Sequence, residues 1–389
     1  MNKTITHIDC FSGPGGICTG FKAAGIETKI AIEKVESCVD TYSHNHPSVS
    51  VIHKDIRKVS EKDIKERYNG TIDILTSGMP CETFSTAGAT SRSSYDFRQQ
   101  LYSEAIRIAK IVQAKIILFE NVPGILSKKV EKGGKRLIIE DLFDELSSNG
   151  YKYYIQTTLK ANDFQVPQKR ERYFIIATNQ ENLDLSIPIA KHNGETTVKD
   201  AFLGLPKIEA NDPVERKKYN KGESKYTELL KDNEFWKLGK DINSKLTYHV
   251  APKHRASTIK RFELIEPGEN LKDLFFKFPK EEVEELQKQK ILPKKWFIQR
   301  NKRLEFNKVS KTVTSHCLDE LVHPKLNRAL TVREVARLQS FPDNYQFVGG
   351  PFICPHMYET QDKYEQIGDA VPPLLAYHWG LTIKKILQG

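Results

Sequence analysis

Short apolar runs alternate with amphipathic stretches along the first 180 residues. The apolar runs predict strands at 4–9, 29–32, 49–53, 72–76, 116–119 and 173–177. Between them, apolar residues recur every three or four positions and predict helices, for example at 102–113 and 137–147. Alternation of strands and helices predicts an α/β fold with a doubly wound, mostly parallel sheet.

The pattern changes near residue 190. From there to about residue 327 the chain is polar and rich in Lys and Glu, with few apolar runs. A helical pattern returns at 331–339, and 372–387 predicts a final amphipathic helix. We therefore expect a split catalytic domain, residues 1–188 and 345–389, with a different domain inserted at 189–344.

Composition narrows the class of protein. A chain of 389 residues that is 39% hydrophobic can build a substantial core. No apolar run reaches the roughly 18 residues of a membrane span, so we expect a cytosolic protein. The six cysteines show no CxxC pair and no metal-ligand spacing, which predicts free thiols and no metal.

Positive charge is concentrated in the middle of the chain. The net charge is +10, and residues 201–311 contribute 26 Lys and Arg against 17 Asp and Glu, a difference of +9. Such an excess suits nucleic acid, although an ordinary lysine-rich surface has the same composition. Composition leaves both interpretations open.

Three successive predicted strands end in residues that suit a nucleoside-type cofactor. Residues 9–16 form a glycine-rich loop after the first strand, where the backbone can approach a ligand. Glu33 ends the second strand, where a carboxylate can accept ribose hydroxyls, and Asp55 ends the third. Each acid alone is more often a solvated strand end, but the series favours a cofactor. The loop lacks the G-x-G-x-x-G pattern of nicotinamide enzymes.

The next two strands bring a thiol and a carboxylate to the same edge. Cys81 follows Pro80 in a Ser- and Thr-rich loop, the surroundings of a reactive thiol, although a lone cysteine is usually buried and inert. Glu120 follows the fifth strand. Arg170 and Arg172 precede the last strand, and in isolation they are as typical of a surface charge cluster.

Six ordered motifs, at residues 11–16, 80–81, 120–122, 168–172, 328–342 and 366–373, resemble those of the bacterial DNA cytosine-5 methyltransferases. The resemblance covers about 4–180 and 310–389. It implies a Rossmann-like methyltransferase domain that uses S-adenosylmethionine and releases S-adenosylhomocysteine. It also implies that the inserted domain recognises the target sequence.

The resemblance implies specific catalytic roles. Cys81 would attack carbon 6 of a cytosine flipped out of double-stranded DNA, and Glu120 would hold its ring nitrogen 3 and amino group. Arg172 would bind the carbonyl oxygen 2, and Arg170 would steady the thiolate and a phosphate. Residues implied to contact the cofactor are Phe11, Ser12, Gly13, Gly15, Gly16, Glu33, Lys34, Asp55, Ile56, Leu101, Asp369 and Ala370. Those implied to contact DNA are Ser85, Arg98 and Thr312.

The chain departs from the family pattern at four positions: Met79, Glu82, Asp369, and Lys34, which stands where an aromatic often covers adenine. We expect a monomer acting in the bacterial cytosol on the nucleoid, with a restriction endonuclease for the same site as a compatible partner. Three alternatives remain: an RNA-directed relative, a catalytically inactive DNA-binding homologue, and an unrelated Rossmann oxidoreductase. The long basic insert argues against the first and the intact motifs argue against the other two.

Overall fold

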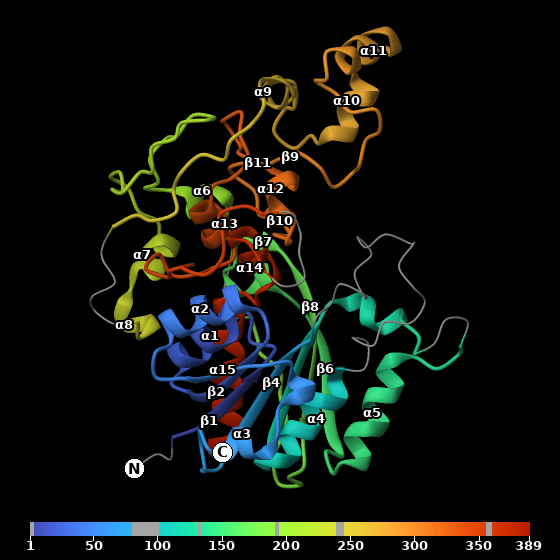
Figure 1. Cartoon of the computed structure of the whole chain (residues 1–389), viewed down its shortest axis with the longest axis vertical. Helices are drawn as coiled ribbons and strands as arrows, with labels where there is room; N and C mark the ends of the chain where they lie inside the picture. Colours follow the sequence, from blue (N-terminus) through green and yellow to red (C-terminus); the bar gives the residue numbers. More distant parts are fainter. Residues whose placement is uncertain (1–3, 80–100, 131–133, 191–193, 239–244, 355–359) are drawn as a thin grey trace.

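The computed structural model describes residues 4–79, 101–130, 134–190, 194–238, 245–354 and 360–389. A seven-stranded sheet with helices on both faces occupies one end of the molecule, and a smaller lobe stands beyond it (Figure 1). The sheet order is β3-β2-β1-β4-β5-β8-β6. Its strands are β1 (Thr6–Cys10), β2 (Glu27–Glu33), β3 (Ser50–His53), β4 (Ile74–Gly78), β5 (Ile116–Asn121), β6 (Tyr153–Lys160) and β8 (Glu171–Thr178).

Strand directions confirm the predicted mostly parallel sheet. Strands β1 to β5 pair in parallel, and β8 runs antiparallel to both of its neighbours, β5 and β6. The six predicted strands are all present, each within two residues at either end. Strand β6 was not predicted from the sequence. This strand lies at the edge of the sheet and is mostly exposed, so it contains no apolar run.

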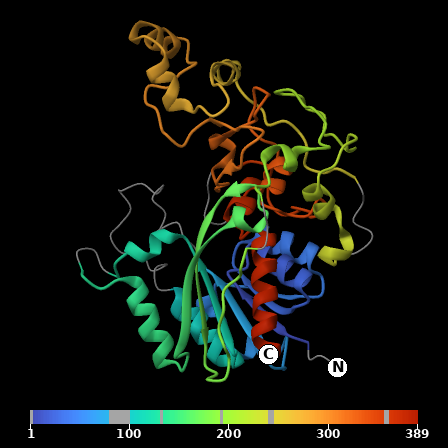
Figure 2. The ribbon, with the colours of Figure 1, turned by 180° about the vertical axis from the view of Figure 1, so that it is seen from behind.

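Each face of the sheet carries its own hydrophobic core. Helices α4 (Leu101–Val112) and α5 (Ile138–Ser148) cover one face, as predicted, and the short α3 (Glu61–Lys65) lies near them. On the other face, α1 (Gly16–Ala24) packs against α15 (Pro373–Gln388), the predicted final helix (Figure 2). The two helices approach closely, because a Cβ on Gly20 would lie 2.3 Å from the Pro373 carbonyl oxygen.

Residues 194–238 and 304–347 extend the same core rather than forming a separate one. Helices α6 (Val198–Phe202), α7 (Lys225–Lys231), α8 (Asn233–Trp236) and α13 (Val332–Leu338) contribute side chains to the hydrophobic cluster of α1 and α15. Every residue of α13 is buried, and Arg337 forms a buried ion pair with Asp343 at 2.6 Å. Arg328 and Glu334 form a second such pair at 2.8 Å.

A distinct outer lobe comprises residues 253–303. It contains α9 (Ala256–Leu264), α10 (Leu271–Lys277), α11 (Lys280–Lys288) and the short strand β9 (Lys302–Arg303). A small hydrophobic cluster of its own, which includes Phe262, Leu271, Leu274 and Leu292, holds it together. β9 pairs in parallel with β11 (Leu321–Val322), which follows α12 (Cys317–Glu320) and connects the lobe to the rest of the molecule.

The segment after α13 has a packing role. Tyr345 and Phe347 are fully buried in the main core, and Asn45 of α2 (Glu36–Asn45) bonds to the backbone of Gln346 at 2.7 Å and 3.0 Å. α14 (Lys363–Asp369) then leads into α15. Among the described residues, no helix combines the length and apolar character that a membrane crossing requires.

Candidate active site

The carboxyl ends of β1, β2, β4 and β5 meet at one edge of the sheet, on the side of the outer lobe (Figure 1). The strand register places Cys10 beside Ser77 and Gly78 beside Glu120. Residues that follow these strands therefore gather within one region. This is the place where open α/β sheets bind their ligands.

The three glycines of the first loop have different surroundings. Among the described residues, no atom lies within 4 Å of a Cβ placed on Gly13, so this part of the structure leaves space beside it. A Cβ on Gly15 would lie 2.8 Å from the Tyr345 hydroxyl, and one on Gly16 would lie 2.2 Å from the Val371 carbonyl oxygen. A ligand can approach the backbone at Gly13, whereas Gly15 and Gly16 allow the C-terminal segments to pack.

Glu33 is fixed against this loop. One carboxylate oxygen accepts a hydrogen bond from the Gly13 backbone N–H at 2.9 Å. The other accepts from the backbone N–H groups of Lys34 and Val35, both at 2.8 Å. The carboxylate thus lies beside the open space at Gly13, while the Lys34 side chain is exposed.

Asp55 lies at the end of β3 and is paired with Arg57, whose backbone N–H and Nε donate to one carboxylate oxygen at 3.0 Å and 2.9 Å. These bonds lower the pKa of Asp55 to about 2. Ile56 and Leu101 are buried in the hydrophobic cluster of α4, and Phe11 packs partly buried against it. These three predicted cofactor contacts therefore belong to one hydrophobic cluster.

Several buried polar atoms at these strand ends have no hydrogen-bond partner among the described residues. They are Asp9 Oδ2, Ser12 Oγ, Ser77 Oγ and Asn121 Nδ2. Burial, reinforced by the charge of Glu33, raises the pKa of Asp9 to about 7. An unpartnered buried polar group costs about 1–3 kcal/mol, which a bound polar ligand can recover. The residues present thus fit a polar, nucleoside-type cofactor.

Glu120 and Arg172 face each other at the end of β5. Arg172 Nε lies 2.8 Å from Glu120 Oε1, and both side chains are about nine-tenths buried. Burial raises the pKa of Glu120, and the charges of Arg172 and Arg170 oppose that shift without cancelling it. A buried carboxyl with a raised pKa can deliver a proton to a base that enters the site.

Arg170 is buried behind this pair and binds backbone carbonyl oxygens. Its guanidinium donates to Val313 at 2.6 Å and to Gly368 and Ala370 at 3.0 Å each. These bonds tie three distant segments together. From the sequence, Arg170 was expected to steady the thiolate and a phosphate. That role stays a prediction.

The remaining predicted residues lie at the rim. The Asp369 carboxylate is exposed and accepts a bond from Gln361 Nε2 at 2.9 Å, while Ala370 is buried. Thr312 donates its hydroxyl to the Lys169 backbone oxygen. This bond lies beside the short parallel pair of β7 (Gln168–Lys169) and β10 (Ser310–Lys311).

Four predicted positions, Cys81, Glu82, Ser85 and Arg98, lie outside the described residues. Conversely, Asp9, Ser77 and Asn121 were absent from the predicted site. The signal that could have found them is their position at strand ends, the same signal that identified Glu33 and Glu120.

The fold and the strand-end residues together define an S-adenosylmethionine-dependent methyltransferase, and the chain belongs to the C-5 cytosine-specific DNA methylase family. The model of that family matches residues 5–385. The predicted enzyme class, DNA (cytosine-5-)-methyltransferase, and the predicted Rossmann-like fold are confirmed.

Particular relatives extend over nearly the whole chain. The type II methyltransferase M.DdeI of Desulfomicrobium norvegicum is 34% identical over 377 residues, which are 95% of this chain and 86% of the relative. The type II methyltransferase M1.HphI of Haemophilus parahaemolyticus is 29% identical over 96% of this chain and 85% of its own length. A solved structure described as a DNA modification methyltransferase encoded within an E. coli prophage is 27% identical, with a TM-score of 0.74, and the match covers 99% of this chain and all of that chain.

Proposed function

We propose that this protein methylates carbon 5 of a flipped cytosine in a specific double-stranded DNA sequence, through a covalent bond between Cys81 and carbon 6. The observation that carries the proposal is the pairing of Gly78 on β4 with Glu120 on β5. Gly78 comes three residues before Cys81 in the chain. The pairing brings the backbone leading to the thiol next to a buried carboxyl with a raised pKa. Arg172 lies on the other side of that carboxyl.

The side chains then have complementary tasks. Protonated Glu120 donates its proton to ring nitrogen 3, and Arg172 binds the carbonyl oxygen 2, so the ring becomes electron-poor. The Cys81 thiolate forms a bond to carbon 6, and the displaced electron pair makes carbon 5 nucleophilic. S-adenosylmethionine, when bound, supplies the methyl group and is converted to S-adenosylhomocysteine.

The ring must then return to an aromatic state. Carbon 5 loses its proton to water, the bond to Cys81 breaks, and nitrogen 3 returns its proton to Glu120. Neither carbon 5 nor carbon 6 is accessible inside a duplex, so the base must leave the stack. The reaction as proposed uses no metal.

We propose that residues 1–188 and 345–389 perform the catalysis and that 189–344 provide target recognition. Within the second region, the outer lobe 253–303 has its own hydrophobic cluster and a net charge of +6, from 14 Lys and Arg against eight Asp and Glu. Thr312 and Arg170 lie where that region meets the catalytic residues. Arg170 acts there as a positioning residue, because its donors tie its own strand to two distant backbone segments, at Val313 and at 368–370.

We propose that the enzyme works as a monomer on the nucleoid of a bacterial cytosol, within a restriction-modification or epigenetic system. A restriction endonuclease that cleaves the same site is the compatible partner. Ser85 and Arg98, as predicted from the family, contact the DNA, and Thr312 contacts its backbone beside the target base.

Covalent trapping tests the proposal. The target site is first mapped by bisulfite sequencing. In the presence of S-adenosylmethionine, duplexes carrying 5-fluorocytosine at that site should form an adduct that survives a denaturing gel, since fluorine cannot leave as a proton does once carbon 5 is methylated. Cys81→Ser should give no adduct, and Cys354→Ser, a substitution of a half-buried thiol, should trap normally. Equal trapping by Cys81→Ser would refute the nucleophile. Methyl transfer to transfer RNA instead of DNA would establish the RNA-directed alternative.

A further inference from the structure

The outer lobe exposes large apolar side chains in one short run. Phe297 is 58% exposed and Ile298 is 59% exposed, next to Trp296 at 39%. Phe276 of α10, 71% exposed, lies 6.0 Å from Trp296 between ring centroids. Single exposed apolar residues are common, but a contiguous group of this kind marks an interaction surface.

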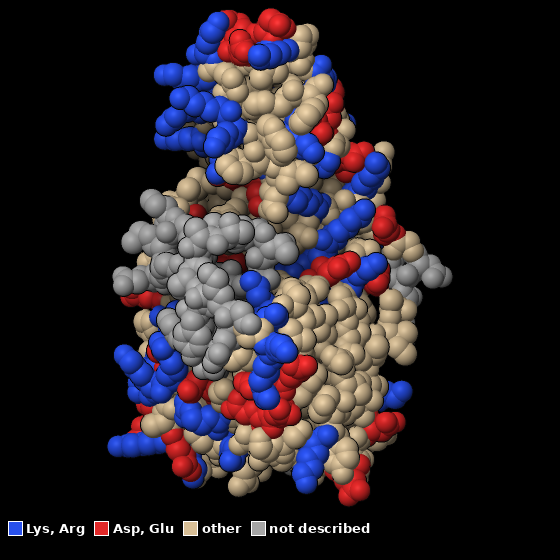
Figure 3. Space-filling view, turned by 90° about the vertical axis from the view of Figure 1, so that its right-hand side faces the viewer, with Lys and Arg blue, Asp and Glu red and all other residues tan. Residues whose placement is uncertain are grey.

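Cations lie directly over these rings. The Lys272 ammonium is 5.1 Å from the centre of the Trp296 ring and 5.5 Å from that of Phe276. The Arg300 guanidinium is 5.6 Å from the centre of the Phe297 ring. Four of the eight acidic residues of the lobe are on α11, which leaves the rest of the lobe strongly basic. Figure 3 shows Lys and Arg side chains gathered on this end of the molecule.

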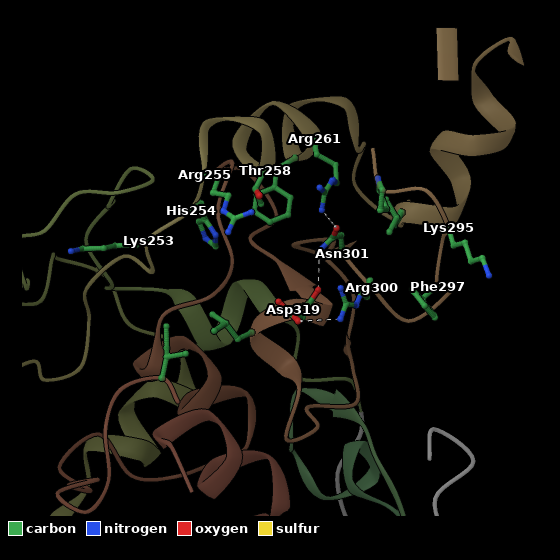
Figure 4. Close-up of a pocket in the computed structure, with 15 residues that line it drawn as sticks. Lys253, His254, Arg255, Thr258, Arg261, Lys295, Phe297, Arg300, Asn301 and Asp319 are labelled. Carbon is green, nitrogen blue, oxygen red and sulfur yellow. Dashed lines mark hydrogen bonds and ion pairs between the residues drawn. The ribbon is translucent and has the colours of Figure 1, made fainter. Parts of the chain in front are cut away.

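A cavity of about 440 Å³ opens beside the same run, with Phe297 and Lys295 on its wall (Figure 4). Arg261 reaches into it and donates to Asn301 Oδ1 at 3.3 Å. Arg300 lies 3.5 Å from Asp319, the one carboxylate among the residues that line the described cavity. The lining of the cavity thus combines apolar side chains such as Phe297 with five Lys and Arg against one carboxylate, so its net charge is positive.

We propose that residues 294–300 form a DNA wedge, in which Phe297 and Ile298 press against base faces while Lys295 and Arg300 neutralise phosphates. This inference rests on the proposed function and names the residues that grip its substrate. A flat aromatic face beside cations complements the two components of DNA, stacked bases and phosphates. A second copy of the chain would offer a surface of the same positive charge, which the cations of the lobe would repel.

The two contact types give different experimental signatures. Apolar contact with bases stabilises binding without releasing counterions, so its loss lowers affinity at every salt concentration alike. Phosphate contact releases counterions, so its loss flattens the dependence of affinity on salt. Substitutions at Phe297 and at Lys295 therefore separate the two roles.

The experiment measures the Kd for a duplex containing the mapped site, by fluorescence anisotropy across a salt series. Phe297→Ala combined with Ile298→Ala should raise Kd about 5- to 100-fold, the usual loss of one stacked base, and leave the salt slope unchanged. Lys295→Ala should reduce that slope by about one. Leu381→Ala, which truncates a leucine of α15 that is 41% exposed and lies outside the proposed recognition region, should leave Kd within twofold of wild type. Phe297→Trp keeps an aromatic face and should retain affinity.

Three results would overturn the wedge: a Kd within twofold of wild type for the double variant, a flattened salt slope in that variant, or a wild-type dimer in light scattering that the double variant abolishes. The last result would assign the surface to a second copy of the chain. Failure of the proposed function is distinct, since bisulfite sequencing would then find no methylated site, whereas the same salt series on a duplex of arbitrary sequence would still test the wedge.

Discussion

Charged side chains are buried around α13, where Arg337 and Asp343 form an ion pair that is almost completely enclosed. Arg337 also donates to the backbone oxygens of Ala201 and Leu203, so this buried charge joins segments that are far apart in the chain. In the outer lobe the opposite holds, because apolar side chains rather than charged ones are out of place. Phe276, Phe297 and Ile298 are exposed, and a cation lies over each of the two phenylalanine rings. The lobe thus leaves apolar surface available to a partner. The difference separates side chains that hold the enzyme together from those that face its substrate.

The largest expected effect is catalytic. Glu120→Gln should lower the turnover number about 10²- to 10⁴-fold, because the amide cannot supply a proton to the cytosine ring. DNA affinity should stay near wild type, since the outer lobe is unchanged. Glu171→Gln, on an exposed neighbour of Arg172, is the matched control. Turnover within about threefold of wild type would move the acid role to another carboxyl, with Glu82 as the next candidate.

A matched pair of arginine substitutions compares the two regions directly. Arg337→Met should reduce the free energy of unfolding by about 3–5 kcal/mol, because Asp343 is left buried without its partner. Arg300→Met breaks an exposed pair with Asp319 and should cost at most about 1 kcal/mol. Urea titration measures both. Equal losses would show that the outer lobe depends on charge pairing as strongly as α13 does.

The strand-end polar groups should make the stability of the sheet domain depend on pH. The pKa of Asp9 is raised to about 7 in the folded protein, so folding favours its protonated form. Its stabilising effect is present below about pH 4 and is lost as pH rises to about 7. Asp9→Asn should therefore raise the free energy of unfolding at pH 8, by up to about 4 kcal/mol, and change it little at pH 4.

Thermal unfolding of the ligand-free protein at the two pH values measures this difference. Asp163→Asn, which makes the same change at an exposed position, controls for the amide itself. A benefit of Asp9→Asn that is equal at pH 4 and pH 8 would contradict the assignment to proton uptake.

A smaller contrast concerns apolar packing. Leu142 and Leu274 are both fully buried, the first under the sheet and the second in the outer lobe. Each Leu→Ala change should cost about 2–5 kcal/mol, with Leu274→Ala at the lower end because its small cluster can collapse around the gap. Proteolysis should cleave Leu274→Ala within the lobe first. Cleavage that begins in the sheet domain would show that the lobe is not a separate cooperative unit.

Much of the sheet was predictable because buried parallel strands read as apolar runs. The site role of acids at strand ends, such as Glu33 and Glu120, could also be predicted, since the topology alone brings the ends of parallel strands together. The edge strand β6 could not be predicted from an apolar run, because most of its residues are exposed. The pattern at 331–339 predicted a helix, and α13 confirmed it.

The surroundings of charged and small residues were harder to predict. Arg333, Glu334 and Arg337 look like a solvated helix face, yet all three are buried, and the two arginines donate to distant segments that no local pattern identifies. Arg337, for example, donates to the backbone oxygens of Ala201 and Leu203 at 2.9 Å. Gly16 likewise resembles a ligand-binding glycine, but its small size admits the Val371 carbonyl. Such roles depend on contacts between distant segments, which spacing along the chain does not encode.

The packing of α15 against α1 has a consequence for folding during synthesis. Almost the entire sequence is translated between these two helices, and at about 5–20 residues per second that interval is roughly 20–70 s. During this time α1 and one face of the sheet lack the partner that covers them. Contacts this distant in sequence also slow folding, because a long loop must close before they form. The nascent enzyme thus carries an uncovered apolar face until its last helix leaves the ribosome, which makes chaperone dependence during translation an expected property of this chain.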